Sequence, residues 1–144
     1  MRIMKIRKGV AAVVFAKIRG KKKYFILKRK LHWKGWEFLK GGLKKGENPD
    51  NAIRREIKEE TGKLSCDYEL RKTKHSYSFE YKMPFIHDGI LWDGAKNRIY
   101  TAEFDNSEIK LDKEEHSGFR WVSKKEALKL LTWPEQKKIF KRLI

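Results

Sequence analysis

The sequence predicts an α/β domain in which a few helices pack on a β-sheet. Three observations support this fold class: short apolar runs typical of buried strands, three segments that begin like helices, and no internal repeat, low-complexity tract or linker. Strands mixed with few helices favour helices packed on a sheet. The 144 residues fit one domain, 1–144, which is long enough to bury a real core.

Six segments have the composition or the period of strands. The first two, VAAVVFAKI and KYFILKRK, are joined by a turn around Gly20. The third, WEFLK, runs straight into two glycines, and the next two alternate apolar and polar residues with a period of two. The predicted strands are residues 10–18, 23–30, 36–40, 75–82, 97–104 and 118–122.

The two helices near the C-terminus are predicted from their start signals. Ser123 and Glu126 have the spacing of a capping box, which favours a helix over 124–131. Thr132 is expected to cap a last helix over about 134–143.

Composition argues against a disordered or membrane-spanning protein. Apolar residues make up 40% of the chain and 18 are aromatic (5 Trp, 5 Tyr and 8 Phe). No apolar run approaches the roughly 20 residues of a membrane span. The N-terminal run VAAVVFA, although preceded by basic residues, lacks the cleavage site of a signal peptide. The single cysteine, Cys66, cannot form an internal disulfide, which favours a reducing, cytoplasmic location.

The chain is strongly basic, with 36 Lys and Arg against 19 Asp and Glu and a formal net charge of +17. Long-range attraction then favours polyanionic partners such as nucleotides or RNA. The alternative is that the charge reflects solubility or heat adaptation, because basic residues are spread along the whole chain. The charge alone leaves both interpretations open.

The scarce carboxylates are nevertheless concentrated, since Glu47, Glu56, Glu59 and Glu60 lie within one short segment. Like charges three or four apart on a helix repel each other by about 0.2–0.5 kcal/mol per pair. Something should offset that repulsion, and a divalent cation is the simplest candidate. The alternative interpretation is a solvated acidic patch at the end of a helix.

The segment has the start and end signals of a helix. Asn48 is a good cap, Pro49 suits the first helical position, and Gly62 suits the position just past the end. At 100° per residue, Ile53 and Ile57 share an apolar stripe, and three carboxylates lie along its flank. Magnesium prefers such oxygen ligands, together with waters and substrate phosphates.

The stretch GGLKKGENPDNAIRREIKEETGK, residues 41–63, fits the pattern G-x5-E-x7-R-E-U-x-E-E-x-G, in which U is apolar. This pattern resembles the Nudix box of the Nudix hydrolases. One departure is Lys63 at the final apolar position, which touches no catalytic carboxylate. The resemblance implies the Nudix fold, a mixed β-sheet sandwiched between α-helices, over essentially the whole chain.

The resemblance also implies a reaction, the magnesium-dependent hydrolysis of a nucleoside diphosphate linked to another moiety, with Mn²⁺ as a substitute metal. Carried over position by position, Glu56, Glu59 and Glu60 would bind metal, and the carbonyl of Gly41 would complete the shell. Arg55 would hold Glu56, and Glu56, Glu59 and Arg55 would form the catalytic set. Metal ions would neutralise phosphate charge and lower the pKa of the attacking water.

Glu47 is expected to be structural or to support the metal ligands without binding the metal itself. Sequences outside the box point to the substrate. WEFLKGGLKKGE resembles the W-E-F-P-K-G motif of asymmetric diadenosine tetraphosphate hydrolases, which implies that Lys40 contacts a phosphate. EEHSGFRWVSKKEALKLL resembles the E-H-x-x-x-R-W segment of the same subfamily. It implies that Glu115 is an extra metal ligand or the base, that Glu103 is a weaker candidate, and that His116 tunes the loop.

Two tyrosines are candidates for substrate binding. Tyr77 and Tyr81 lie about where that subfamily places its adenine-stacking tyrosine. Because they are two residues from Phe79 on either side, all three side chains can point to one face of a strand. At least some of them should belong to the core. The following segment, YKMPFIHDGILWDGAKN, is expected to be a long loop or hairpin bordering the site.

The favoured substrate is a dinucleoside polyphosphate, with diadenosine tetraphosphate cleaved to ATP and AMP. The second candidate is RNA, because bacterial RNA 5′ pyrophosphohydrolases share the box and the R-W passage, and a basic surface favours a polymer. Nucleotide-sugar or ADP-ribose cleavage ranks third. A non-catalytic nucleotide sensor of the same fold remains an alternative from a different class.

Overall fold

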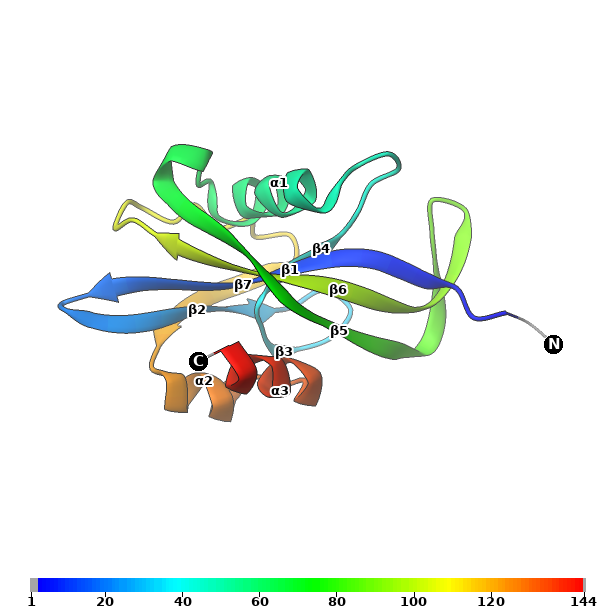
Figure 1. Ribbon diagram of the computed structural model, residues 1–144. Helices are drawn as coiled ribbons and strands as arrows, with labels where there is room; N and C mark the ends of the chain where they lie inside the picture. The colour runs from blue at the N-terminus through cyan, green and yellow to red at the C-terminus, as the bar shows by residue number, and fades with distance from the viewer. Residues whose placement is uncertain (1–2, 144) are drawn as a thin grey trace.

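The computed structural model describes residues 3–143, in which a mixed β-sheet lies between one helix on one side and two on the other (Figure 1). The α/β class and the Nudix-type sandwich are therefore confirmed. In chain order the elements are β1 (Ile6–Ile18), β2 (Lys21–Arg29), β3 (Gly35–Glu37), β4 (Leu39–Gly42), α1 (Pro49–Thr61), a 3₁₀ turn (Ser65–Asp67), β5 (Tyr68–His87), β6 (Ile90–Phe104), β7 (His116–Val122), α2 (Lys124–Leu130) and α3 (Pro134–Leu143).

The sheet is organised around β1. Its strand order is β3-β2-β1-β6-β5, with β4 also paired to β1 and β7 also paired to β2. The β1–β6 pairing is parallel, and all other pairings are antiparallel. Because β4 pairs with the first half of β1, the two glycines at the end of β4 lie beside the first residues of β1.

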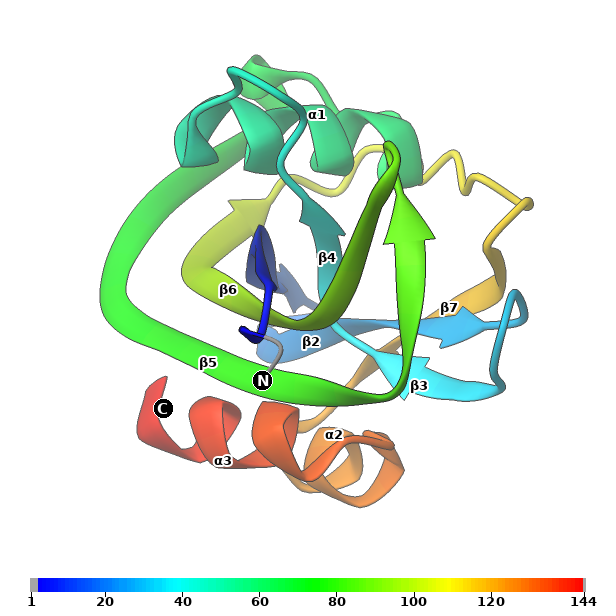
Figure 2. The same ribbon diagram turned by 90° about the vertical axis from the view of Figure 1, so that its right-hand side faces the viewer.

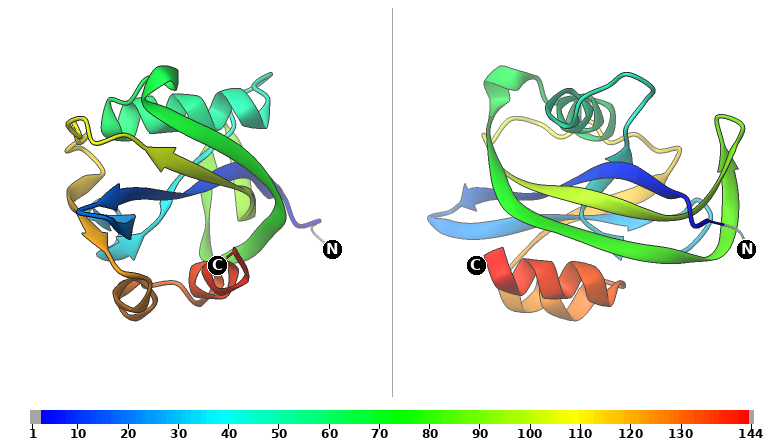
Figure 3. Two further views of the ribbon diagram at one scale, coloured as in Figure 1. Left: turned by 60° about the vertical axis from the view of Figure 1, so that its left-hand side comes forward. Right: turned by 45° about the vertical axis from the view of Figure 1, so that its right-hand side comes forward.

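Both faces of β1 are buried, which explains its continuous apolar sequence. Val10, Ala12 and Val14 belong to the core under α1, whereas Val13 belongs to the core under α2 and α3. Successive side chains of a strand point to opposite faces, so one apolar run supplies both cores. Figure 3 shows the resulting layers from two further directions: α1 on one side, the sheet, and α2 with α3 on the other.

The hairpin of β5 and β6 is longer than predicted. Strands expected over 75–82 and 97–104 extend to Tyr68–His87 and Ile90–Phe104. Asp88 and Gly89 connect them with φ of 52° and 74°, the left-handed values that a two-residue hairpin turn needs. Figure 2 shows β5 curling from beside α1 to beside α3. The hairpin alternative for the segment after Tyr81 is thereby confirmed.

The segment expected as one strand over 36–40 is divided into β3 and β4. Residues 35–37 pair with β2, whereas residues 39–42 pair with β1, so the chain changes partner at Phe38. Phe38 is buried in the core under α2 and α3. A five-residue pattern cannot reveal this change, because both halves are equally apolar.

The C-terminal helices begin nearly as predicted. The Ser123–Glu126 capping box is present in full. Thr132 has a different role from the expected cap, because its hydroxyl accepts the Trp36 amide at 2.9 Å and ties β3 to the link between the helices. Trp133, not Thr132, precedes the first residue of α3. Among residues 3–143, no helix combines the length and apolarity needed to cross a membrane.

Candidate active site

Helix α1 presents the acidic cluster because both of its ends are fixed. The Asn48 side chain accepts the Asn51 amide at 2.8 Å, and Gly62 ends the helix with φ of 74°. Ile53 and Ile57 are fully buried against the sheet. Their burial sets the rotation of the helix, so its carboxylate flank faces the end of β4.

Arg55 is the hub of this flank. Its guanidinium donates to both carboxylate oxygens of Glu47, at 2.8 and 2.9 Å, and to the Gly42 carbonyl at 2.9 Å. It also donates to Glu56 at 2.9 Å and to Glu59 at 3.2 Å. The bidentate bond with Arg55 lowers the pKa of Glu47 to about 2. Glu47 thus holds Arg55, as expected for a structural residue, and Arg55 holds the two cluster carboxylates.

Glu56 lies against the backbone of Gly41. A Cβ at position 41 would lie 2.1 Å from the Glu56 carboxyl group, so only glycine allows this approach. Burial, and to a smaller extent the charges of Glu59 and Glu60, raises the pKa of Glu56 to about 7 despite the Arg55 contact. A buried carboxylate with so high a pKa is favourable for a bound cation, whose charge replaces the proton.

Glu60 is held from the other side by His116. The ring nitrogens Nδ1 and Nε2 of His116 lie 2.7 Å from Glu60 Oε2 and 2.7 Å from Glu37 Oε2, and all three side chains are at most 4% exposed. Burial alone lowers the pKa of His116, but the two carboxylates outweigh it and raise the pKa to about 9. The imidazolium therefore donates to both carboxylates.

Glu37 connects this chain to two further cations. Arg29 lies 3.3 Å from Glu37 Oε2, and Lys40 Nζ lies 3.6 Å from Glu37 Oε1. Burial opposes ionisation of Glu37, yet its hydrogen bond with His116 and these two cations hold its pKa below the usual value. Arg29 also reaches Glu115 Oε2 at 3.4 Å. The predicted phosphate contact, Lys40, is thus linked to the predicted metal ligand, Glu60.

The donor set fits a hard divalent cation. One ligand atom each from Glu60, Glu115 and His116 lies within 4.8 Å of the others. Both His116 nitrogens are already committed to carboxylates, so the donors available in this group are the oxygens of Glu60 and Glu115. Within residues 3–143 Glu56 and Glu59 are not part of this group, but both lie on the same flank of α1, with Glu56 beside the Gly41 backbone. Oxygen ligands of this kind suit Mg²⁺ or Mn²⁺ better than a thiolate-seeking metal.

Not every candidate joins this group. Glu103, the weaker candidate, lines a hollow with Phe15 and Leu143 on the α3 side of the sheet, away from α1. The Tyr77 hydroxyl accepts bonds from Asn97 at 3.1 Å and from Gln136 at 3.3 Å in the interior. Tyr77 is therefore a core residue with satisfied polar contacts.

Tyr81 is better placed than Tyr77 for contact with a substrate. Lys40 Nζ lies 5.0 Å from the centroid of the Phe79 ring, and that ring packs edge-on against Tyr81 at 5.5 Å. Tyr81 in turn packs against Phe85 at 4.7 Å. This aromatic row starts at the predicted phosphate contact and runs along the hairpin. The substrate-binding roles of Lys40, Tyr77 and Tyr81 stay predictions.

Arg7 is a site residue that sequence reasoning missed. Its guanidinium lies over Gly42, where a Cβ would come within 2.1 Å of Cζ, and its Nη2 lies 3.0 Å from His87 Nε2. Among residues 3–143, no carboxylate forms an ion pair with Arg7. As one of many cations near the N-terminus, Arg7 gives no distinguishing signal in the sequence.

Lys63, the departure from the box pattern, is only 1% exposed. Its ammonium group lies 2.5 Å from Asp105 Oδ1 and 2.8 Å from the Ser107 carbonyl, and it also contacts the Ser107 hydroxyl. Lys63 thereby fastens the end of α1 to the segment that leads to Glu115. The departure exchanges an apolar contact for an ion pair at the same place.

Comparison with known proteins places the chain in a family. A family model described as the NUDIX domain matches residues 7–143. The RNA pyrophosphohydrolase of Vibrio atlanticus is 30% identical over 99 residues, which cover 61% of this chain and 56% of that protein. The corresponding protein of Pseudomonas putida (strain GB-1) is 29% identical over 104 residues, 66% of this chain and 65% of the relative. The chain thus spans little more than half of the length of the first of these relatives.

Solved structures with the same fold include proteins named for different substrates. The C. elegans Ap4A hydrolase, in a binary complex, superposes with a TM-score of 0.76 at 20% identity, covering 96% of this chain and 95% of that one. The E. coli dihydroneopterin triphosphate pyrophosphohydrolase gives a TM-score of 0.77 at 18% identity, covering 99% and 98%. At these identities the similarity shows the fold alone.

Proposed function

The chain belongs to the NUDIX family, and we propose that it is a pyrophosphohydrolase that uses Mg²⁺, or Mn²⁺ in its place, to cleave a phosphoanhydride bond of a nucleotide substrate. The observation that carries this proposal is the arrangement of Glu56, Glu59 and Glu60 on one flank of α1. Arg55 orients two of these carboxylates and His116 the third. A helix with a purely structural role would not need three fixed carboxylates close to a glycine backbone, because these carboxylates repel one another.

A divalent cation, when bound, supplies neutralisation of phosphate charge and a water of lowered pKa. The residues of the chain provide the rest. Glu56, Glu59 and Glu60 would hold the cation through their oxygens, and Arg55 keeps the first two in place. Glu115, which lies beside Glu60 and is partly exposed, is the proposed acceptor of the proton from the attacking water.

Lys40 and Arg7 are the proposed contacts to the substrate phosphates. The ion pair of Lys40 with Glu37 is long, at 3.6 Å, and among residues 3–143 Arg7 forms no ion pair with a carboxylate, so both cations are suited to bind an incoming anion. Both lie on strands that meet at the glycine pair. A phosphate group between them is close to the carboxylate flank of α1.

Two substrates fit this chemistry. The motifs around Lys40 and Glu115 favour a dinucleoside polyphosphate, such as diadenosine tetraphosphate cleaved to ATP and AMP. The relatives named RNA pyrophosphohydrolase favour the 5′ end of a triphosphorylated RNA as a second candidate. A non-catalytic, nucleotide-sensing domain is a further alternative, against which the complete set of α1 glutamates argues.

A head-to-head hydrolysis assay tests the proposal. Diadenosine tetraphosphate and a short 5′-triphosphorylated RNA are compared by kcat/KM with magnesium and with excess chelator, and the products are separated by chromatography. We expect turnover of at least one substrate, abolished by the chelator. Absence of magnesium-dependent turnover of both would contradict the proposed activity and favour the sensor.

A further inference from the structure

The excess of positive charge is distributed unevenly along the chain. Residues 1–36 contain 13 Lys and Arg and no Asp or Glu, and residues 120–144 contain 8 against 2. Residues 37–119, which include α1 and the carboxylate cluster, contain 15 against 17. The net charges of +13, −2 and +6 add to the total of +17 and leave the central part nearly neutral.

The helices α2 and α3 carry more exposed, unpaired cations than α1, where within residues 3–143 only the Lys58 side chain lacks an ion pair or hydrogen bond. On the α1 side, Arg55, Lys63 and Lys72 each lie within 4.0 Å of a carboxylate. The exposed cations of α2 and α3 are called the α2–α3 face here. In the described range 3–143 none of them forms an ion pair, a hydrogen bond or a ring contact. They are Lys124, Lys125, Lys129, Lys138, Lys141 and Arg142.

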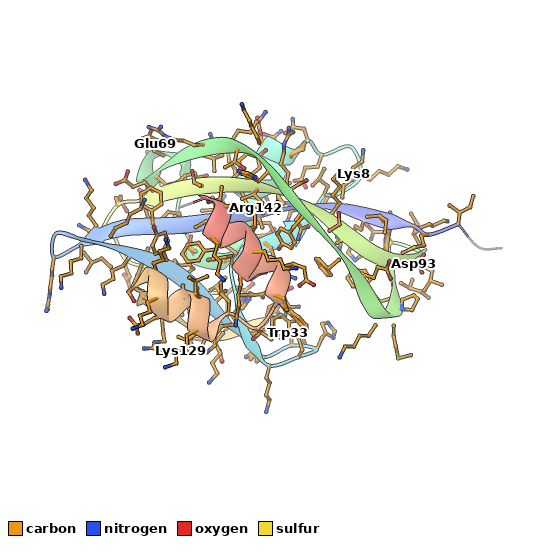
Figure 4. All side chains as sticks on the ribbon, turned by 60° about the horizontal axis from the view of Figure 1, so that its bottom comes forward. Lys8, Trp33, Glu69, Asp93, Lys129 and Arg142 are labelled. Carbon is orange, nitrogen blue, oxygen red and sulfur yellow. The ribbon has the colours of Figure 1, made fainter. Side chains whose placement is uncertain are left out.

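Figure 4 looks onto this face, with Lys129 on α2 and Arg142 on α3 labelled and Trp33 beside them. Cations that are already paired with carboxylates contribute little to the field at a distance. Six unpaired cations on two neighbouring helices repel one another and attract a polyanion. The face is therefore suited to bind a chain of phosphates.

Aromatic residues connect the α2–α3 face to the active site. Arg29, which reaches Glu115 at 3.4 Å, lies over the Trp33 ring at 5.9 Å. Trp33 packs edge-on against Trp133 at 4.8 Å, and Trp133 is in the link between α2 and α3. Both indole rings are only half-buried. A route of cation and aromatic surface thus leads from the catalytic carboxylates to the basic helices.

We propose that the α2–α3 face binds the body of a single-stranded RNA whose 5′ phosphates lie at the α1 site. This inference rests on the proposed function and selects RNA from its two substrate candidates. Single strands are bound by basic surfaces that follow the backbone and by aromatic side chains on which bases stack. A dinucleoside polyphosphate has only a few phosphates, whereas a single-stranded RNA also carries phosphates beyond its 5′ end that these cations can bind.

An anionic membrane is a less suitable partner for the same face. Membrane-surface helices need exposed apolar side chains opposite their basic face. In α2 and α3 the large apolar residues, such as Ile139 and Phe140, are buried against the sheet. The face therefore offers charge and two tryptophan edges but no apolar surface to insert.

Fluorescence anisotropy with a 5′-hydroxyl RNA of about 15 nucleotides tests the proposal without any hydrolysis. Binding of this RNA needs neither metal nor catalysis, so its outcome is independent of the proposed activity. We expect binding that weakens with salt, with a slope of log K against log salt of about −0.7 per phosphate contacted. Absence of RNA binding at about 50 mM salt overturns the proposal.

Two matched variants locate the surface. Lys129→Glu with Lys138→Glu reverses two charges on the α2–α3 face, whereas Lys58→Glu with Lys110→Glu reverses two exposed charges on the α1 side. Lys129 and Lys58 both lie in the last turn of their helices, so the change in helix stability is similar. We expect a loss of RNA affinity of about tenfold or more for the first pair and a much smaller loss for the second.

Equal losses in the two pairs would show that only the net charge matters and would overturn the proposal. Binding of the wild type to vesicles of anionic lipid, but not to RNA, would overturn it in favour of a membrane. The first pair should also keep the circular dichroism spectrum and the melting temperature of the wild type, which shows that it is folded. Trp33→Leu is expected to weaken RNA binding by about 1–3 kcal/mol per lost stacking contact, or roughly fivefold or more.

Discussion

The α1 layer and the α2–α3 layer cover the two faces of one sheet, yet they differ in how many of their cations are paired with carboxylates. Both layers bury a compact apolar stripe, and both rest on alternate residues of β1. In the α1 layer Arg55 is bonded to three carboxylates. In the α2–α3 layer the exposed cations have no such partners among the described residues. Packing is thus shared, and the difference in function lies in the polar flanks.

The comparison shows how one fold separates chemistry from binding. A fixed carboxylate cluster needs short distances, burial and neighbours that hold each oxygen. Long-range attraction of a polymer needs only charge that is not already neutralised. Placing the two functions on opposite faces keeps the unpaired cations from pairing with the catalytic carboxylates.

The largest effect is expected at the carboxylate cluster. Glu56→Gln removes a buried oxygen ligand and the partner of Arg55, so kcat/KM should fall about 1000-fold or more. The matched control is Glu135→Gln in α3, which should stay within about twofold. The measurement is magnesium-dependent hydrolysis of the better substrate, with circular dichroism to verify folding. Full turnover by folded Glu56→Gln would exclude this role for the cluster.

A smaller effect is expected for the chain that holds Glu60. Glu37→Gln removes one carboxylate from His116 and leaves the orientation of Glu60 less fixed, so kcat should fall about 10- to 100-fold. KM should change less, because the phosphate contacts remain. A purely structural role would instead lower the melting temperature and leave kcat of the folded fraction unchanged.

In the buried ion pair of Lys63 and Asp105 at the end of α1, loss of the carboxylate should destabilise the protein more than loss of the ammonium group. Asp105→Asn leaves the Lys63 ammonium buried without its carboxylate, so the melting temperature should fall by about 5 °C or more. Lys63→Leu removes the charge and restores an apolar residue, so its effect should be smaller. In the other layer, exposed Lys129→Ala should change the free energy of unfolding by about 0.5 kcal/mol or less. Calorimetry of the three variants makes the comparison, and a larger loss for Lys63→Leu would contradict it.

The weakest effect is a dependence of metal affinity on pH. Glu56 has a pKa of about 7, raised by burial from 4.5, so its proton competes with the cation below pH 7. The apparent affinity for magnesium should rise by up to about tenfold per pH unit between 6 and 7 and level off above it. In the metal-free protein the stability linked to this raised pKa is present below about pH 4.5 and is lost as the pH rises through about 7. Magnesium titrations of the rate at several pH values test the first statement.

The sequence is informative where function depends on local spacing. The box sets the order of residues on one helix, so spacing alone is enough to place Arg55, Glu56 and Glu60 on a common flank. The predicted cap at Asn48 and the predicted end at Gly62 are confirmed for the same reason. These features depend on residues that are neighbours in the chain.

Contacts between distant segments could not be predicted. Glu37 and His116 are far apart in sequence and meet only because β3 and β7 both pair with β2. Arg7 reaches the glycine pair through the pairing of β1 with β4. Tyr77 and Tyr81 have the same spacing from Phe79, but only the position of α3 decides that the Tyr77 hydroxyl is buried by Gln136. The strand register and the order of the layers determine the contacts of such residues, and neither can be predicted from one segment of the sequence.

The most direct test of the central claim is a titration of the protein with Mn²⁺ in the absence of substrate. Electron paramagnetic resonance measures the free ion, at about pH 7.5, where Glu56 is mostly ionised. The wild type is predicted to bind Mn²⁺, and Glu60→Gln is predicted to weaken that binding about tenfold or more, with no loss in the Glu135→Gln control. Equal binding by wild type and Glu60→Gln would contradict the claim that the α1 carboxylates form the metal site.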